Sequence, residues 1–191
     1  MHRFVVEPAI NSSDAVAVID ASSGLTTTRR ELLEGVQAAA RFLVSRGVMP
    51  EQRILMCCVD RPTFLMWFWG AMWIGAVPVP VSTMLTEKDY RFLLEDSRAV
   101  AVAFSEEFQE VITSAATDQP FLRWSQLDSD FGVSSDEVET PEPYPSIKDD
   151  IAFWLYTSGT TGFPKGAIHR HADLGFCTDK YAAAILEMNA D

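Results

Sequence analysis

The chain is poor in basic residues. Its 191 residues include 15 Lys and Arg against 27 Asp and Glu, which gives a formal net charge of −12. Nucleic acids and anionic membrane surfaces are bound through clustered Lys and Arg, so this balance argues against both as partners. The 48% apolar and 22% charged residues are typical of a globular protein and exclude a disordered or fibrous chain.

Cysteine is scarce as well. Three cysteines, two of them adjacent at Cys57 and Cys58, cannot form a disulfide framework. We interpret the adjacent pair as small apolar core residues in a reducing compartment. Residues 1–8 contain no sustained apolar run, so no secretory signal is recognised. We therefore expect a cytoplasmic protein.

Charge is absent from residues 62–86, and residues 64–77 are densely apolar. A run of this kind raises the alternative of a membrane-spanning helix. Gly75, Pro78 and Pro80 interrupt the run, and prolines would remove helix hydrogen bonds deep in lipid. We therefore favour a buried helix of about 14 residues followed by a short extended strand.

Strand and helix signals alternate along the first 117 residues. Short apolar runs predict strands, whereas capping residues followed by amphipathic repeats predict helices. The expected strands are 15–20, 53–59, 77–81 and 99–104, and the expected polar helices begin after Thr28, in a capping box with Glu31, and after Thr86 or Ser82. This alternation predicts right-handed crossovers and an α/β fold of mainly parallel sheets flanked by helices.

Residues 118–150 differ in character, because they combine four prolines with a dense acidic run. We interpret them as an acidic, proline-containing connection between an α/β subdomain, 1–117, and residues 151–191, with one short strand near 121–124. The acidic residues are Asp128, Asp130, Asp136, Glu137, Glu139 and Glu142. Their spacing fits no Ca²⁺ loop, so we expect a solvated face rather than a metal cluster.

A loop rich in glycine and hydroxyl groups lies between two predicted strands, 150–156 and 167–169. The hydroxyl-bearing residues are Thr157, Ser158, Thr160 and Thr161, and the glycines are Gly159, Gly162 and Gly166. Glycines let the main chain approach a ligand closely, and successive N–H groups form an anion-binding concavity. Lys165 adds a positive charge that an acidic protein needs to attract a polyphosphate. The pattern therefore predicts a phosphate-binding loop.

The best-known alternative, the Walker A loop, fits this segment poorly. Its two glycines stand five positions apart and its lysine is followed by Ser or Thr and a helix. Here Gly159 and Gly162 are closer, Pro164 precedes the lysine, and Gly166 and a predicted strand follow it.

Residues 156–166, Tyr-Thr-Ser-Gly-Thr-Thr-Gly-Phe-Pro-Lys-Gly, resemble the phosphate-loop signature of the adenylate-forming enzymes. That superfamily includes acyl- and aryl-CoA synthetases, peptide-synthetase adenylation domains and luciferases. Segments 25–26, 75–80 and 93–97 are also similar to the family's N-terminal region. The His-x-His after the loop and the aromatic residues of 64–73 tilt the resemblance toward the branch of benzoate-CoA ligases.

The resemblance implies that residues 1–191 form an incomplete N-terminal AMP-binding domain, the first part of a large domain. An aromatic-Gly-x-Thr-Glu segment, a ribose-binding Asp and a C-terminal catalytic Lys, which the family has later in its sequence, have no counterpart here. We therefore expect a fragment or truncated form of a longer enzyme, inactive alone. Self-association is also expected, because a sheet cut in mid-domain leaves apolar surface uncovered.

The resemblance also implies a chemistry. These enzymes join a carboxylic acid to ATP, giving an acyl-adenylate and pyrophosphate, and then transfer the acyl group to a thiol, usually coenzyme A. An aromatic or other hydrophobic acid is expected. By resemblance, the ATP phosphates would be bound by Thr157, Ser158, Gly159, Thr160, Thr161, Gly162 and Lys165. Lys165 would neutralise phosphate charge or anchor the loop, and Mg²⁺ would enter with ATP near Thr160 or Thr161.

Other functions stay open. The acceptor thiol could belong to a carrier protein, or the chain could be a non-catalytic nucleotide-binding scaffold. A zinc site at His169 and His171 is not favoured, since the chain has only three histidines. A last helix is expected from about residue 171, with an apolar stripe of Leu174, Cys177, Tyr181, Ile185 and Met188.

Overall fold

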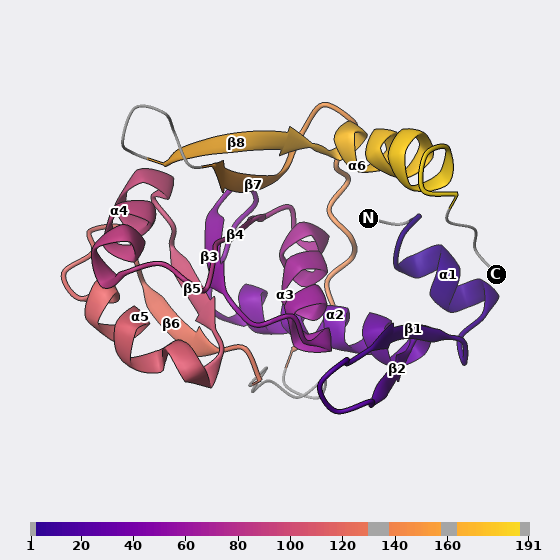
Figure 1. Cartoon of the computed structure of the whole chain (residues 1–191), viewed down its shortest axis with the longest axis horizontal. Helices are drawn as coiled ribbons and strands as arrows, with labels where there is room; N and C mark the ends of the chain where they lie inside the picture. Colours follow the sequence, from indigo (N-terminus) through magenta and orange to yellow (C-terminus); the bar gives the residue numbers. More distant parts are fainter. Residues whose placement is uncertain (1–2, 130–137, 158–163, 188–191) are drawn as a thin grey trace.

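A computed structural model describes residues 3–129, 138–157 and 164–187 of the chain (Figure 1). Its centre is a four-stranded parallel sheet made of β3 (Arg53–Cys57), β4 (Val77–Pro80), β5 (Ala101–Phe104) and β6 (Trp124–Leu127), in the order β4-β3-β5-β6. All three neighbouring pairs run parallel. The prediction of an α/β fold built mainly on parallel strands is therefore confirmed.

Helices cover both faces of this sheet, and the alternating side chains of β3 show why. Ile54 and Met56 point into a core shared with α2 (Arg29–Ser45) and α3 (Pro62–Trp73). Leu55 and Cys57 point into a second core shared with α4 (Glu87–Ser97) and α5 (Gln109–Ala116). Because successive residues of a strand face opposite sides, a continuous apolar run fills two cores at once.

The starts of two helices are fixed by reciprocal capping boxes. The Thr28 side chain accepts the backbone N–H of Glu31, and the Glu31 carboxylate accepts the Thr28 N–H. Thr86 and Asp89 do the same at the start of α4, which decides between Thr86 and Ser82 as its cap. Each box satisfies backbone donors that the first helical turn leaves unpaired.

The densely apolar segment forms α3, of 12 residues, and not a longer helix. Trp67 is fully buried, and Gly75, with φ of +74°, ends the segment directly before β4. In the part of the chain that the structure describes, no helix is long and apolar enough to cross a bilayer. The adjacent Cys57 and Cys58 are buried free thiols, as the sequence predicted.

Smaller elements complete the N-terminal part. Helix α1 (Val6–Asn11) precedes β1 (Val16–Ile19) and β2 (Thr26–Thr28), which pair in an antiparallel manner. A short 3-10 helix, η1 (Glu106–Phe108), leads from β5 into α5. The strand expected at 15–20 is thus present, although its antiparallel partner was not anticipated.

The segment 118–150 differs from its prediction in two respects. Its strand is Trp124–Leu127 rather than 121–124, and it extends the parallel sheet beside β5. Asp128, expected in solvent, is only 2% exposed. Glu139 and Glu142 are exposed as expected, whereas Asp130, Asp136 and Glu137 lie outside the described residues. Asp128 directly follows β6, beside β5, and there the buried Ser105 hydroxyl donates a hydrogen bond to its carboxylate at 2.6 Å.

An antiparallel hairpin, β7 (Ile151–Thr157) and β8 (Lys165–Arg170), lies beside β4, the edge strand of the parallel sheet (Figure 1). Helix α6 (His171–Cys177) follows and continues as a π-helix, η2 (Thr178–Ala183). The apolar stripe predicted there does not form a buried face, because the exposed fractions of Tyr181 and Ile185 are 56% and 67%. Met188 lies outside the described residues. An ion pair between Arg3 and Asp179, at 2.7 Å, joins this end to the region of α1.

Candidate functional site

The predicted phosphate loop connects β7 to β8. Thr157, the last residue of β7, is directly opposite Lys165, the first residue of β8, and both side chains are exposed. The structure therefore brings these two predicted residues together at the mouth of the hairpin, the end where the connecting loop begins. The other five, Ser158, Gly159, Thr160, Thr161 and Gly162, lie outside the described residues.

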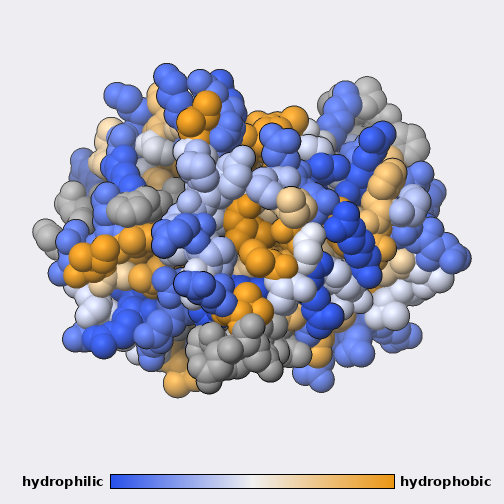
Figure 2. Space-filling model, turned by 180° about the vertical axis from the view of Figure 1, so that it is seen from behind, coloured by the Kyte–Doolittle hydropathy of each residue, from blue (hydrophilic) through white to orange (hydrophobic). Residues whose placement is uncertain are grey.

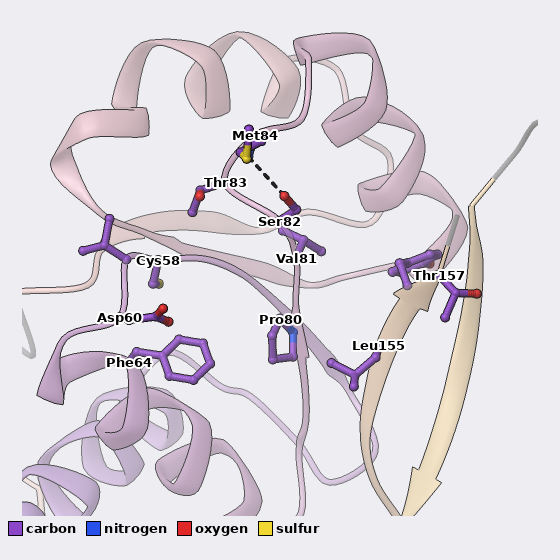
Figure 3. A pocket seen from close by; sticks show the side chains of 12 residues that line it. Cys58, Asp60, Phe64, Pro80, Val81, Ser82, Thr83, Met84, Leu155 and Thr157 are labelled. Atoms are coloured by element: carbon purple, nitrogen blue, oxygen red, sulfur yellow. Dashed lines mark hydrogen bonds between the residues drawn. The ribbon is translucent and has the colours of Figure 1, made fainter. Parts of the chain in front are cut away.

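A cavity of about 710 Å³ adjoins the mouth of this hairpin (Figure 3). Its walls come from the segments that follow β3 and β4, from the start of α3, and from the end of β7. The lining residues are Cys58, Val59, Asp60, Phe64, Pro80, Val81, Ser82, Thr83, Met84, Leu155, Tyr156 and Thr157. Open α/β sheets bind ligands beyond the carboxyl ends of their strands, and this cavity lies at that edge.

The cavity lining contains both apolar and polar side chains. Phe64, Val81 and Leu155 offer apolar surface, whereas Asp60, Ser82, Thr83 and Thr157 offer oxygen atoms. The backbone N–H of Met84 donates to the Ser82 hydroxyl at 3.2 Å, which shapes the turn after β4 (Figure 3). A site of this composition suits a molecule with an apolar body and a polar end.

Sequence analysis did not assign the lining residues Asp60, Ser82 and Thr83 to the site. Each follows a parallel strand within a few residues, and that position is the signal that could have found them. Their contact with the β7 end, however, depends on the strand order, which the sequence alone does not provide.

A buried hydrogen-bond chain holds the turn after β4. The Cys57 thiol lies 3.3 Å from the Tyr90 hydroxyl, which donates to the Ser82 carbonyl at 2.9 Å. Burial is the main cause that raises the pKa of Tyr90 far above its ordinary value, and the contact with Cys57 adds to it. The hydroxyl therefore keeps its proton. The neutral Tyr90 hydroxyl therefore holds the Ser82 backbone, which forms part of the cavity wall.

The end of β7 that leads into the loop is held against α4. The Tyr156 hydroxyl donates to the Asp96 carboxylate at 2.6 Å. Burial and the Asp96 charge raise the pKa of Tyr156, which keeps this donor protonated at neutral pH. The Arg53 guanidinium lies 5.7 Å from the ring centre of Trp154, and its Nε donates to the Ser97 carbonyl at 2.7 Å. Burial followed by the nearby Arg98 lowers the pKa of Arg53.

The remaining reactive side chains near the site have structural roles. Burial and the Asp128 charge raise the pKa of Cys58, so its thiol is a poor nucleophile. His169 stacks on Phe153 with ring centres 4.6 Å apart. Burial lowers the pKa of the half-buried His171. Across residues 3–129, 138–157 and 164–187, no group of three or more His, Cys, Asp or Glu side chains is arranged to hold a metal ion.

Comparisons with known proteins agree with this arrangement. The family model described as AMP-binding enzyme matches residues 6–189. The chain is 40% identical over 165 residues to the 4-hydroxybenzoate--CoA/benzoate--CoA ligase of Rhodopseudomonas palustris, covering 82% of this chain and 30% of that protein. It is 36% identical over 146 residues to the benzoate--CoA ligase of Thauera aromatica, covering 73% and 28%.

A solved structure gives the same result in three dimensions. The benzoate CoA ligase of Burkholderia xenovorans LB400 superposes with a TM-score of 0.83 at 31% identity, covering 97% of this chain and 38% of that one. The chain spans about a third of the length of the curated relatives it matches.

Proposed function

The chain belongs to the family of AMP-binding enzymes, and from that premise we propose that it forms the N-terminal part of an ATP-dependent ligase that joins an aromatic carboxylic acid to coenzyme A. The observation that carries the proposal is the position of the Thr-Ser-Gly-Thr-Thr-Gly loop, whose described ends, Thr157 and Lys165, face each other beside a cavity lined by apolar and polar side chains. The similarity to two benzoate-CoA ligases supports an aromatic acid as the substrate class.

The proposed reaction has two steps. A carboxylate oxygen of the acid attacks the α-phosphorus of ATP, forming an acyl-adenylate while the bond to pyrophosphate breaks. The thiolate sulfur of coenzyme A then attacks the acyl carbon, and AMP leaves with the electron pair of the broken C–O bond. Each step needs a substrate held in line with its leaving group.

The loop answers the electrostatic problem of the first step, because negative charge accumulates on the departing pyrophosphate. Preorganised donors at its oxygens stabilise that charge, and one such donor contributes about 3–4 kcal/mol. We assign this role to Thr157, Ser158, Gly159, Thr160, Thr161 and Gly162. Lys165 neutralises phosphate charge from the opposite strand or anchors the loop.

The proposed function also implies a metal ion, a cellular compartment and an association state. Mg²⁺ is proposed to accompany the ATP phosphates near Thr160 or Thr161, as a counter-charge to the triphosphate. Cys57 and Cys58 are buried free thiols, which supports a reducing compartment, and we propose the cytoplasm. Exposed Phe176 and Ile185 support self-association of the 191-residue chain.

Carboxylate-dependent exchange of labelled pyrophosphate into ATP tests the function. The native-length gene product would be assayed with benzoate, acetate and a medium-chain fatty acid, and the 191-residue chain would serve as the control. We expect exchange with benzoate by the native-length form alone. The absence of exchange with every acid would overturn the proposal and favour a non-catalytic nucleotide-binding scaffold.

The thiol acceptor needs a separate measurement. Thioester formation would be followed with benzoate, ATP and free coenzyme A. We expect benzoyl-CoA to accumulate. If adenylation proceeds but free coenzyme A is not acylated, a carrier-protein thiol becomes the better acceptor.

A further inference from the structure

A buried pair of polar side chains is hydrogen-bonded to a segment that lines the cavity, and the proposed reaction uses neither of them. Ser105, directly after β5, is fully buried, and Asp128, directly after β6, is 2% exposed. The Ser105 hydroxyl donates to the Asp128 carboxylate at 2.6 Å. A buried carboxylate is costly to desolvate, so its presence calls for a compensating role.

The pair is connected to the wall of the cavity. The backbone N–H of Val59 donates to the Ser105 hydroxyl at 2.9 Å. Val59 belongs to the turn between β3 and α3, which lines the cavity together with Cys58 and Asp60. A continuous chain of bonds thus runs from the Asp128 carboxylate through the Ser105 hydroxyl to the turn.

This connection lies where the chain leaves two neighbouring strands, β3 and β5, in opposite directions along the sheet. From β3 the chain continues through α3 to β4 on one side, and from β5 it continues through α5 to β6 on the other. The segments that leave β3 and β5 therefore diverge. The Ser105 hydroxyl, which accepts the Val59 N–H, joins the two segments.

Asp128 also holds α3. Its backbone carbonyl accepts the indole N–H of the fully buried Trp67 at 2.8 Å. Phe64, three residues before Trp67 and so on the same helix face, lines the cavity. One residue therefore restrains both the turn and the helix that form this wall.

We propose that Asp128 and Ser105 are positioning residues, which hold the β3–α3 wall in place and thereby set the affinity for the organic substrate in the cavity. The part that concerns affinity rests on the proposed function, whereas the part that concerns the turn does not. In the described part of the chain neither residue bonds to the loop ends Thr157 or Lys165, and we therefore expect KM to change more than kcat.

Two variants of the native-length gene product test the proposal. Ser105→Ala removes the acceptor of the Val59 N–H but leaves a buried carboxylate without its donor, which could prevent folding. The double variant Ser105→Ala with Asp128→Asn removes that charge as well. Ser45→Ala is the control, since the Ser45 hydroxyl, at the end of α2, donates to the Phe42 carbonyl of its own helix at 2.7 Å.

Two readouts are needed. Hydrogen exchange resolved at residues 58–61 reports the turn, and we expect the Val59 amide to exchange about tenfold faster in either folded Ser105 variant. Steady-state kinetics report the cavity: the KM for benzoate or for coenzyme A should rise about fivefold, with kcat within about twofold. Ser45→Ala should change neither.

The outcomes separate the two proposals. Unchanged Val59 exchange in the folded double variant would overturn the positioning role, whatever the activity. Faster exchange with unchanged KM for both organic substrates would overturn the link to affinity. If the wild-type enzyme activates no acid, the proposed function fails, and hydrogen exchange alone decides whether the pair holds the turn.

Discussion

At the scale of single residues, Lys165 and Thr157 mark the two ends of the candidate loop. They face each other across the last pair of the β7–β8 ladder. A lysine at this position is a flexible point charge that can follow a phosphate group as it departs. The chain as a whole has a net charge of −12 and repels polyphosphates at long range, which makes a local cation more important.

Replacing Lys165 by alanine should therefore slow adenylation by at least about tenfold in the native-length gene product, as one charge-stabilising contact is lost. Pyrophosphate exchange at saturating benzoate measures the effect. Lys148→Ala, which removes an exposed lysine at a different cavity, is the control. Exchange at the wild-type rate in Lys165→Ala would exclude Lys165 from the mechanism.

A second residue-scale prediction concerns pH and the capping box of α2. The Thr28 backbone N–H and hydroxyl, which donate to the Glu31 carboxylate at 2.7 and 2.8 Å, lower the pKa of Glu31 below its ordinary value of 4.5. Because the folded pKa is the lower one, this stabilisation is complete above pH 4.5 and is lost as the pH falls through the folded pKa.

Glu31→Gln should consequently lower Tm at pH 7, and the difference from wild type should shrink as the pH falls below 4.5 and the wild-type carboxylate becomes protonated. Thermal unfolding at a series of pH values measures the difference. Glu34→Gln, on the same helix but away from its start, is the control. A Tm difference between wild type and Glu31→Gln that stays constant down to the acid limit would contradict this account.

At the scale of elements, the contact between α2 and α3 is unusually close. A Cβ added to Gly70 of α3 would lie 2.6 Å from the Ala39 Cβ and 3.0 Å from the Val36 carbonyl oxygen. Small residues on both helices thus allow their backbones to approach. The aromatic side chains of α3 can then fill the space beside the contact.

Gly70→Ala should destabilise the protein although alanine is the better helix former. The gain in helix propensity is about 1 kcal/mol, whereas overpacking a rigid contact costs about 1–3 kcal/mol. Chemical denaturation measures the free energy of unfolding. Gly35→Ala, whose new methyl group has three atoms of the flexible Met66 side chain as its nearest neighbours, should be tolerated better. Equal stability of Gly70→Ala and wild type would show that the helices can separate without cost.

Elements were predictable from the sequence where local chemistry determines them. The capping residues Thr28 and Glu31 and the apolar run of β3 carry their own signals, so helix starts and inner strands were correct. β6 was misplaced by three residues because its sequence, Trp-Ser-Gln-Leu, is only partly apolar. The sequence near Asp128 gives no signal of its burial, because that burial involves a hydrogen bond with Ser105, which is 23 residues away in the chain.

At the scale of the whole molecule, the hairpin and the parallel sheet are separate sheets that meet at one edge. Figure 2 shows apolar side chains near the middle of the back face, surrounded by polar ones. The loop ends were predictable from the motif, whereas the cavity was not, because Asp60, Ser82 and Leu155 meet only once the hairpin lies on the sheet. The bond between Tyr156 and Asp96 helps to hold that arrangement.

Tyr156→Phe should loosen the hairpin without loosening the parallel sheet. The lost hydrogen bond contributes about 0.5–1.5 kcal/mol, and the lower end is expected because Asp96 is exposed. Hydrogen exchange by mass spectrometry should therefore accelerate in β7 and β8 and stay unchanged in β3 and β5. Tyr181→Phe, at an exposed site in η2, is the control. Uniform acceleration across both sheets would show that they unfold together.

The strand order β4-β3-β5-β6 has a consequence for synthesis on the ribosome. β3 pairs with β4 on one edge and with β5 on the other, and the second partner emerges about 50 residues later, a delay of several seconds at ordinary translation rates. During that interval the apolar β3 exposes an unpaired edge to other nascent chains. Chaperone demand should therefore peak just before β5 leaves the exit tunnel.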